Sequence, residues 1–274
     1  MKSVVIVPVF NAFEHLRTCL QSIEDCSPNV KVVVINDAST DVRVQGFLEA
    51  WQNAGTGRTL LCNKKNRGFV YTVNRGMADQ PGNIILLNSD TVVTPGWVEA
   101  LSNCLNSDSK IATATPWSNN GEIVSIPTLC LATPVPEELA QLAKAISNSG
   151  PPEYPELPTA VGFCMAISRT AIENIGMFDE ATFGRGYGEE NDFSMRAHAV
   201  GMINVLCDNA YVAHHGGSSF SPLGMKPDSD SMQRLLNKHP SYDELVAEFI
   251  LNDPLSQRRQ VVNTAIARIM GTMR

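Results

Sequence analysis

Short runs of β-branched and other apolar residues alternate with helical patterns along the first 115 residues. The runs SVVIVPV, VKVVVIND, RTLLCN and NIILLN are each followed by a segment with apolar residues at helical spacing, and IATATP closes the series. Strand and helix in strict succession are typical of βαβ units. We therefore predict an α/β fold with a mostly parallel sheet and helices on both faces.

This alternation stops after residue 115. Residues 116–159 are rich in Pro, Ser and Asn, and they are followed by strand patterns at TAVGFCMAI and NAYVAHH and by helical patterns towards the C-terminus. We expect one domain over residues 1–220, with a nucleotide-type half over 1–115 and a second half over 116–220 that completes the site. A helical extension is expected over 221–274.

Composition narrows the range of partners. The net charge is −7, whereas a general nucleic-acid binder needs a basic footprint, so we expect no nucleic-acid partner. The seven cysteines are scattered without a CxxC pair, which favours reduced thiols. Because the chain lacks an 18-residue apolar run and its first residues lack a signal-peptide pattern, we expect a soluble, cytoplasmic protein.

Polar side chains follow the predicted strands. Ligands of open parallel sheets bind at the carboxyl ends of the strands. The residues at these positions include Asn11, Asp37, Asn63–Gly68 and Asn88–Asp90. The turn VPVFNA has no glycine, which argues against a dinucleotide-binding GxGxxG loop and an NAD enzyme.

Two of these strand ends allow a structural and a functional interpretation. In NDASTD, Asp41 or Thr40 can cap the next helix while Asp37 faces the crevice and accepts hydrogen bonds from a base or ribose. Asn88 and Asp90 are two positions apart and project to the same side of a strand end. They form either a turn or part of a site for Mg²⁺ or Mn²⁺.

The stretch GRGYGEENDFSMR predicts a glycine-rich loop that enters a helix. Glu190 heads a stripe with Phe193 and Ala197 that looks inward, whereas Glu189 and Asp192 belong to a neighbouring stripe that is easily a solvated ladder of ion pairs. Burial would raise the pKa of Glu190 and the helix N-terminus would oppose that rise, so the sequence leaves the net shift open.

The stretch YVAHHGGSSF places two histidines at a strand end before a Gly-Gly turn. Histidine binds Mn²⁺-type ions and donates to phosphate, although a single histidine is more often structural. We expect one of His214 and His215 to reach the crevice.

These segments together resemble a known family. The pieces VPVFNAFEHLRTCLQSI, VVVINDASTD, NRGFVYTVNRGM, IILLNSDTVVTPGWVEAL, GEENDFSMR and VAHHGGSSF occur in the same order as in inverting glycosyltransferases of family 2, which have the GT-A fold. The resemblance covers about residues 3–220 and is greatest to bacterial polysaccharide and rhamnosyltransferase-type members.

The resemblance implies roles for individual residues. The implied nucleotide-binding residues are Pro8, Phe10, Asn11, Asp37, Asn66, Gly68, Asn74, Asn88 and Ser89. Glu190 is the implied catalytic base, and Asp90 and His214 are the implied ligands of Mn²⁺ or Mg²⁺. Glu189, Asp192 and His215 are secondary candidates. Asn88 stands where relatives have the first acid of a DxD motif, and it brings no charge.

The implied reaction is a single displacement at the anomeric carbon of a nucleotide-diphosphate sugar, from UDP or dTDP, by the hydroxyl of a glycan, glycolipid or protein acceptor. A nucleotidyltransferase or a non-catalytic glycan-binding scaffold remains the alternative. The arginine-containing C-terminal helices either pack on their own domain, contact the inner face of a membrane or join two copies of the chain.

Overall fold

In the computed structural model, which describes residues 3–216 and 229–271, each apolar run of the first half is a strand. The strands are β1 (Val4–Val9), β2 (Lys31–Asn36), β3 (Arg58–Cys62), β4 (Ile84–Leu87), β5 (Thr91–Val93), β6 (Ile111–Trp117), β7 (Glu156–Leu157), β8 (Cys164–Ile167) and β9 (Ile203–His214). The proposed domain boundary at 220/221 and the end of the VAHHGGSSF motif lie outside the described residues.

Helices follow most of these strands. They are α1 (Phe13–Cys26), α2 (Val42–Asn53), α3 (Phe69–Ala78), α4 (Trp97–Ser107), the 3₁₀ turn η1 (Glu122–Val124), α5 (Leu139–Ser147), α6 (Arg169–Ile175), α7 (Glu180–Phe183), α8 (Glu189–Ala199), α9 (Ser229–Lys238), α10 (Tyr242–Asn252) and α11 (Ser256–Gly271). Asp41 caps α2 by accepting a hydrogen bond from the Arg43 N–H, as the NDASTD pattern predicts.

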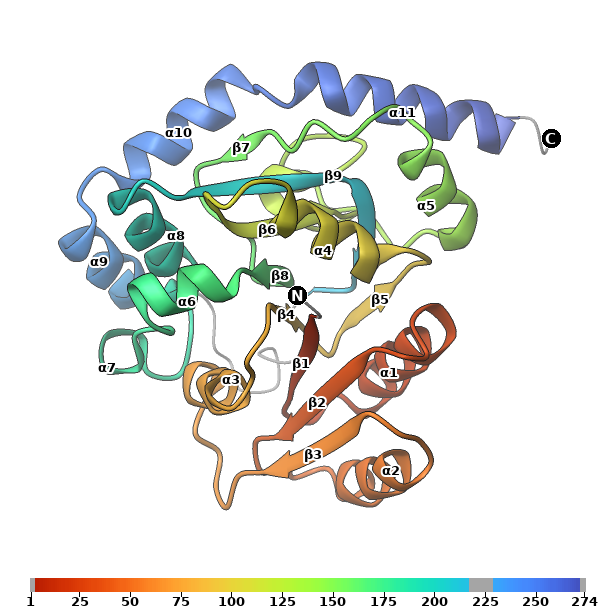
Figure 1. Cartoon of the computed structure of the whole chain (residues 1–274), viewed down its shortest axis with the longest axis vertical. Helices are drawn as coiled ribbons and strands as arrows, with labels where there is room; N and C mark the ends of the chain where they lie inside the picture. Colours follow the sequence, from red (N-terminus) through yellow and green to blue (C-terminus); the bar gives the residue numbers. More distant parts are fainter. Residues whose placement is uncertain (1–2, 217–228, 272–274) are drawn as a thin grey trace.

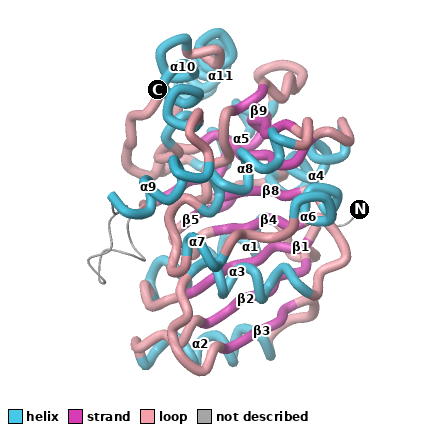
Figure 2. The backbone as a smooth tube through the Cα atoms, turned by 90° about the vertical axis from the view of Figure 1, so that its left-hand side faces the viewer, coloured by secondary structure: helices cyan, strands magenta, loops and turns pink. Residues whose placement is uncertain are grey.

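The strands form one sheet in the order β3-β2-β1-β4-β8-β6-β9-β5, with β7 added beside β9. Figure 2 shows the run from β3 through β2, β1 and β4 to β8. β1 to β4 are parallel to one another, and β6 is parallel to β9. Between these two groups β8 runs antiparallel to both β4 and β6. The carboxyl ends of β1, β2, β4, β6 and β9 therefore meet at one edge, and the amino end of β8 joins them there. We call this the carboxyl edge.

Helices cover both faces of the sheet, as predicted (Figure 1). One core holds side chains of α1, α2, α4 and α5, and the other holds side chains of α3, α6, α7 and α8. The C-terminal helices join these cores. Val262 of α11 and Leu255, just before α11, are fully buried in the first core, and Tyr242 of α10 is buried in the second. Burying each such aliphatic side chain stabilises the fold by about 1.5–3 kcal/mol.

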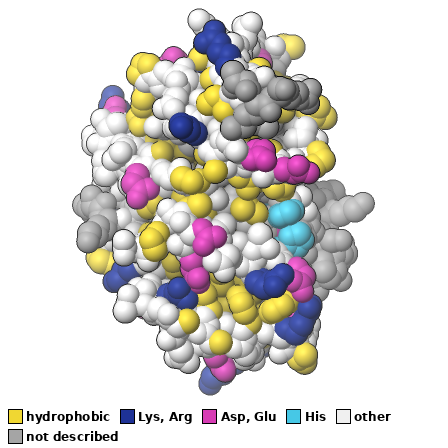
Figure 3. All heavy atoms as spheres, turned by 90° about the vertical axis from the view of Figure 1, so that its right-hand side faces the viewer, with side chains coloured by type: hydrophobic (Ala, Val, Ile, Leu, Met, Phe, Trp, Pro, Cys, Tyr) yellow, Lys and Arg dark blue, Asp and Glu magenta, His cyan; other side chains and the backbone are white. Residues whose placement is uncertain are grey.

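The C-terminal arginines do not share one exposed side. Arg258 and Arg259 of α11 are only 6% and 5% exposed. On the face in Figure 3, basic side chains lie among acidic and hydrophobic ones. Within the described part of the chain, every helix is too short or too polar to cross a membrane.

Candidate active site at the carboxyl edge

Asp90 and His214 come together at the carboxyl edge from opposite parts of the sequence. Asp90 lies in the turn between β4 and β5, and His214 ends β9, which pairs with β5 so that Thr91 lies opposite His214. The distance from His214 Nε2 to Asp90 Oδ1 is 3.4 Å. Burial disfavours charge on the imidazole, but the hydrogen bond and the negative charge of Asp90 outweigh burial and raise the pKa of His214.

Three residues hold the His214 side chain and backbone in place. The Asn119 amide accepts from the His214 N–H at 2.9 Å and donates to the His214 carbonyl at 3.0 Å. His214 Nδ1 lies 2.8 Å from the Asn120 carbonyl, and the Phe163 ring stacks on the imidazole at 5.3 Å between centroids. Asn119 therefore holds the backbone of His214, and Asn120 and Phe163 hold its imidazole ring.

The sequence analysis missed these three residues, although a signal existed for two of them. Asn119 and Asn120 follow β6 as Asn88 follows β4, so the strand-end rule applies to them as well. Phe163 precedes its strand. Because β8 is antiparallel, the residues before it, not those after it, lie at the carboxyl edge.

The facing atoms of Asp90 and His214 fit a divalent cation. A carbonyl only accepts hydrogen bonds, so Nδ1 carries the proton of the neutral ring and the Nε2 lone pair faces the Asp90 carboxylate. Two electron-rich atoms so placed need a proton or a cation between them. Imidazole nitrogen and carboxylate oxygen both bind Mn²⁺. Within residues 3–216 and 229–271 no cluster of three or more His, Cys, Asp or Glu residues could hold a metal.

His215 points elsewhere. Its ring contacts the ring of His15 in α1, with 4.5 Å between centroids, and its backbone N–H donates to the Asp90 carbonyl. Burial and the neighbouring His15 lower its pKa. Of the two tandem histidines, His214 is therefore the one whose side chain meets Asp90.

Glu190 lies in the first turn of α8, after the left-handed Gly188. Burial raises the pKa of Glu190 to about 7, against the opposing effect of backbone N–H groups at the helix start. The adjacent Glu189 is 6% exposed, and burial together with the Glu190 charge raises its pKa too. The balance that the sequence left open is thus decided by burial.

Residues 162 and 163 connect Glu190 with the Asp90–His214 pair. A Cβ atom on Gly162 would lie 3.5 Å from Glu190 Oε1, an ordinary van der Waals distance, so Gly162 directly adjoins the carboxylate. The next residue, Phe163, stacks on His214 and accepts a hydrogen bond from the Asn88 N–H at 2.9 Å. The segment just before β8 therefore brings the base candidate and the metal candidates to the same region.

Glu122 of η1 belongs to this region as well. Burial raises its pKa, which the charge of His214 counteracts, and the charge of Glu122 contributes to the raised pKa of Glu190. Glu122 thus interacts electrostatically with both sides of the site. The sequence analysis did not single it out.

Asp37 braces a loop. Its buried carboxylate accepts from Asn63 Nδ2 at 2.7 Å, from the Arg67 N–H at 2.8 Å and from the Gly68 N–H at 2.8 Å. Gly68 has φ +87°, and a Cβ there would lie 2.6 Å from Arg185 Cα. Glycine therefore allows the loop that enters α8 to dock on this turn. Recognition of a base by Asp37 stays a prediction.

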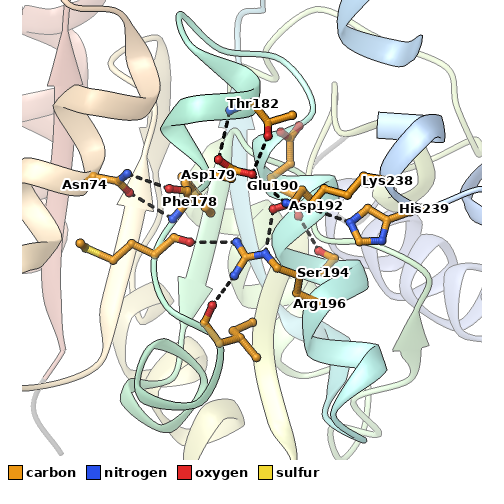
Figure 4. Close-up of polar contacts among 12 residues, drawn as sticks. Asn74, Phe178, Asp179, Thr182, Glu190, Asp192, Ser194, Arg196, Lys238 and His239 are labelled. Atoms are coloured by element: carbon orange, nitrogen blue, oxygen red, sulfur yellow. Dashed lines mark hydrogen bonds and ion pairs between the residues drawn. The ribbon is translucent and has the colours of Figure 1, made fainter. Parts of the chain in front are cut away.

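Other predicted nucleotide-binding residues also contact the backbone or neighbouring side chains. Asn11 Oδ1 accepts from the Thr40 and Asp41 N–H groups, and Asn66 accepts from the Arg185 guanidinium. The Asn74 amide exchanges two hydrogen bonds with the Phe178 backbone, at 2.9 and 3.1 Å (Figure 4). Asn74 thereby links α3 to the segment before α7.

The remaining predicted residues lie along the same edge. Pro8 and Phe10, at the end of β1, and Asn88, after β4, are partly buried, whereas Ser89 is 2% exposed. Their roles in nucleotide binding stay predictions.

Asp192 corrects one expectation. The helical stripe predicted as a solvated ladder is buried, since Glu189 is 6% and Asp192 is 0% exposed. Asp192 contacts Arg196 Nε at 2.8 Å, Lys238 Nζ at 2.7 Å and His239 Nε2 at 2.8 Å (Figure 4). The physical reason is that the end of α9 and the residue after it cover this side of α8, so the carboxylate is a structural anchor.

The sequence of the whole region decides the family. The match to the sequence model of glycosyl transferase family 2 runs over residues 4–176. The chain belongs to glycosyl transferase family 2. This family 2 chain is 34% identical over 102 residues to glycosyltransferase GlyA of Streptococcus pneumoniae serotype 4. The matched region covers 36% of this chain and 14% of that relative.

A longer match is to the N-acetylglucosaminyl-diphospho-decaprenol L-rhamnosyltransferase of Mycobacterium tuberculosis, 24% identical over 78% of this chain and 76% of the relative. The first three curated relatives are longer proteins, of which the matches span 14%, 33% and 32%. Among solved structures, GalNAc-T7 with UDP, GalNAc and Mn²⁺ has a TM-score of 0.63 at 16% identity, over 96% of this chain and 54% of that one. This likeness supports the GT-A fold.

Proposed function

We propose that this family 2 chain transfers a sugar from a nucleotide-diphosphate sugar to an acceptor hydroxyl by an inverting single displacement. The observation that carries the proposal is the convergence at the carboxyl edge of a half-buried Glu190, with a pKa of about 7, and the Asp90–His214 pair. Solved structures of this fold hold UDP or GDP-Man together with Mn²⁺, which supports a nucleotide-diphosphate sugar as donor; the UDP or dTDP class follows from the family resemblance.

Glu190 acts as the general base in this proposal. A base works best when its pKa lies near the working pH, because it is then both deprotonated and basic enough to accept a proton. As the acceptor oxygen attacks the anomeric carbon, its proton moves to a Glu190 carboxylate oxygen and the bond to the diphosphate breaks. Gly162 adjoins the Oε1 side of this carboxylate.

Asp90 and His214 hold the divalent metal in this proposal. A bound Mn²⁺ or Mg²⁺ would supply positive charge against the departing diphosphate. The Nδ1–H of His214 stays with the Asn120 carbonyl, which keeps the other ring nitrogen available towards Asp90. Asn88 adds no negative charge, so of these residues Asp90 alone would bring a carboxylate to the metal, beside the imidazole of His214.

Donor binding is assigned to the strand ends. Pro8, Phe10, Asn11 and Asp37 border the β1 and β2 end of the edge, Asn66, Gly68 and Asn74 border the loop and helix that follow, and Asn88 and Ser89 adjoin the metal candidates. The acceptor then approaches from the side of Glu190 and Glu122. Binding measurements would identify the nucleotide, the sugar and the acceptor.

Calorimetric titration tests the proposal. We expect UDP or dTDP to bind in Mn²⁺ and to lose affinity at least tenfold in EDTA, while GDP and CMP bind more weakly. His214→Ala should cause a similar loss, because it removes a metal ligand. His215→Ala is the matched control, since the adjacent imidazole faces His15, and it should bind within about twofold of wild type. If no nucleotide binds to the wild-type protein, a non-catalytic scaffold with this fold replaces the proposal.

A further inference from the structure

One loop of the second half holds the metal candidate His214. We call residues 118–126 the 118–126 loop. Through Asn119 and Asn120 it bonds the backbone and Nδ1 of His214. The loop is closed on itself by hydrogen bonds from the Ser118 N–H to the Val124 carbonyl and from the Gly121 N–H to Ser125 Oγ. A shift of the loop therefore moves the histidine.

The other side of this loop is held by α11, a helix beyond the residues that match the family. Arg259 Nε donates to the Ser125 carbonyl at 3.1 Å, and its NH2 group donates to the Ile123 carbonyl at 3.4 Å. Arg259 Nη1 donates hydrogen bonds to both carboxylate oxygens of Asp253, each at 2.7 Å. The guanidinium also lies 5.6 Å from the Trp117 ring centroid.

These contacts are specific to a guanidinium. Arg259 is 5% exposed, and a buried charge is tolerated only when it is paired and hydrogen-bonded. The planar guanidinium donates to a carboxylate with one nitrogen and to two loop carbonyls with the others. A lysine ammonium cannot reproduce this geometry. The neighbouring Arg258 points to a different partner, Asp208 of β9.

We propose that Arg259 is a positioning residue of the active site: by fixing the 118–126 loop it fixes His214 opposite Asp90. The role of Arg259 in catalysis rests on the proposed function, whereas the structural connection from Arg259 through the 118–126 loop to His214 does not. The C-terminal helix is then part of the site and not only a cover for the core.

Hydrogen–deuterium exchange tests the link without any metal. In Arg259→Ala, we expect the His214 amide and the amides of residues 119–126 to exchange at least tenfold faster than in wild type. Val262→Ala is the matched control, because Val262 is a fully buried anchor of the same helix with a side chain that offers no hydrogen bond to the loop. It should destabilise the protein while leaving the His214 amide within about threefold of wild type. Arg259→Lys should exchange at an intermediate rate.

Mn²⁺ affinity, measured by calorimetry in the presence of UDP, gives the second readout. Arg259→Ala should weaken Mn²⁺ binding about tenfold and Val262→Ala less than twofold. Unchanged exchange at His214 in Arg259→Ala, or equal acceleration in Val262→Ala, overturns the inference even if wild type binds Mn²⁺ normally. Faster exchange at His214 together with a wild-type protein that binds no Mn²⁺ supports the link and rejects the proposed function instead.

Discussion

At the scale of single residues, the burial of Glu190 lowers the stability of the fold and raises the pKa of the proposed base. Glu190 is placed where burial raises its pKa to about 7, well above the usual 4.5. Between these two values the folded state binds more protons than the unfolded state, so stability falls as pH rises through this window. Above pH 7 the buried charge carries its full cost, on the order of 1–3 kcal/mol for a half-buried group.

Glu190→Gln should therefore separate activity from stability. We expect kcat/KM to fall by roughly 10²- to 10⁴-fold, because the base is lost. At pH 8 the variant should unfold at a higher urea concentration than wild type, and the difference should vanish below about pH 4.5, where the wild-type carboxyl is protonated in both states. A variant with near-normal turnover would show that another group is the base.

The same residue sets the pH dependence of the reaction. Since Glu190 must be ionised to accept a proton, kcat/KM of the wild-type protein should rise with pH and level off above about pH 7. Measurement of initial rates from pH 5 to pH 9 at saturating Mn²⁺ checks this. A flat profile across that range would exclude a base with this pKa.

At the scale of elements, helix α8 carries Glu190, the proposed base, and the neighbours of α8 fix its position. Asp192 has three side-chain partners, of which Lys238 and His239 come from the end of α9 and the residue after it. Burial works against the charge of Asp192, but the hydrogen bonds from Lys238, His239 and Arg196 outweigh it and lower its pKa. A carboxyl with a lowered pKa stabilises the fold above its unfolded pKa and loses that effect as pH falls through its folded pKa.

Asp192→Asn should thus destabilise the protein by about 2–4 kcal/mol at pH 7, since it removes the buried counterion of Arg196 and one of the two carboxylates that pair with Lys238. The gap to wild type, followed by urea unfolding, should narrow below about pH 4. Glu173→Gln is a suitable control: its ion pair with Arg169 is exposed on the carboxylate side and contributes less than about 1 kcal/mol. Equal effects of the two substitutions would contradict the anchoring role.

The helices and strands also show which parts of the fold and of the candidate site can be predicted from the sequence. Periodicity predicts the four parallel strands and their helices, because local patterning decides those elements. The positions at strand and helix ends single out Asp90, Glu190 and the tandem histidines as candidates, and the family resemblance chooses His214. Periodicity fails at Asp192, because a helical stripe shows which residues share a face but not which distant element covers that face. It fails at Phe163 because strand direction is a property of the assembled sheet.

At the scale of the whole molecule, a buried ion pair joins α11 to the sheet. Asp208 is 0% exposed and accepts from Arg258 Nε at 2.5 Å, while the Glu153 and Tyr154 N–H groups donate to the same carboxylate. Such pairs contribute little net stability compared with apolar replacements, yet removing one partner is costly. The ion pair therefore specifies where α11 docks.

A double-mutant cycle tests this docking role. Arg258→Met should lower the free energy of unfolding by about 3–5 kcal/mol, because it leaves Asp208 charged and buried. Adding Asp208→Asn should recover most of that loss, since an amide oxygen still accepts from the backbone without a charge. Additive losses, measured by urea unfolding, would show that the two side chains do not depend on each other.

The contact between Arg259 and Ser125 also has a consequence in time. The two residues are separated by 134 positions in the sequence. A ribosome that adds about 5–20 residues per second leaves roughly 7–27 s between their appearances. During that interval a nascent chain can already assemble its first strands, but the loop beside His214 still lacks its support. The loop beside His214 is therefore supported only after α11 has been synthesised, well after the sheet that carries it has begun to form.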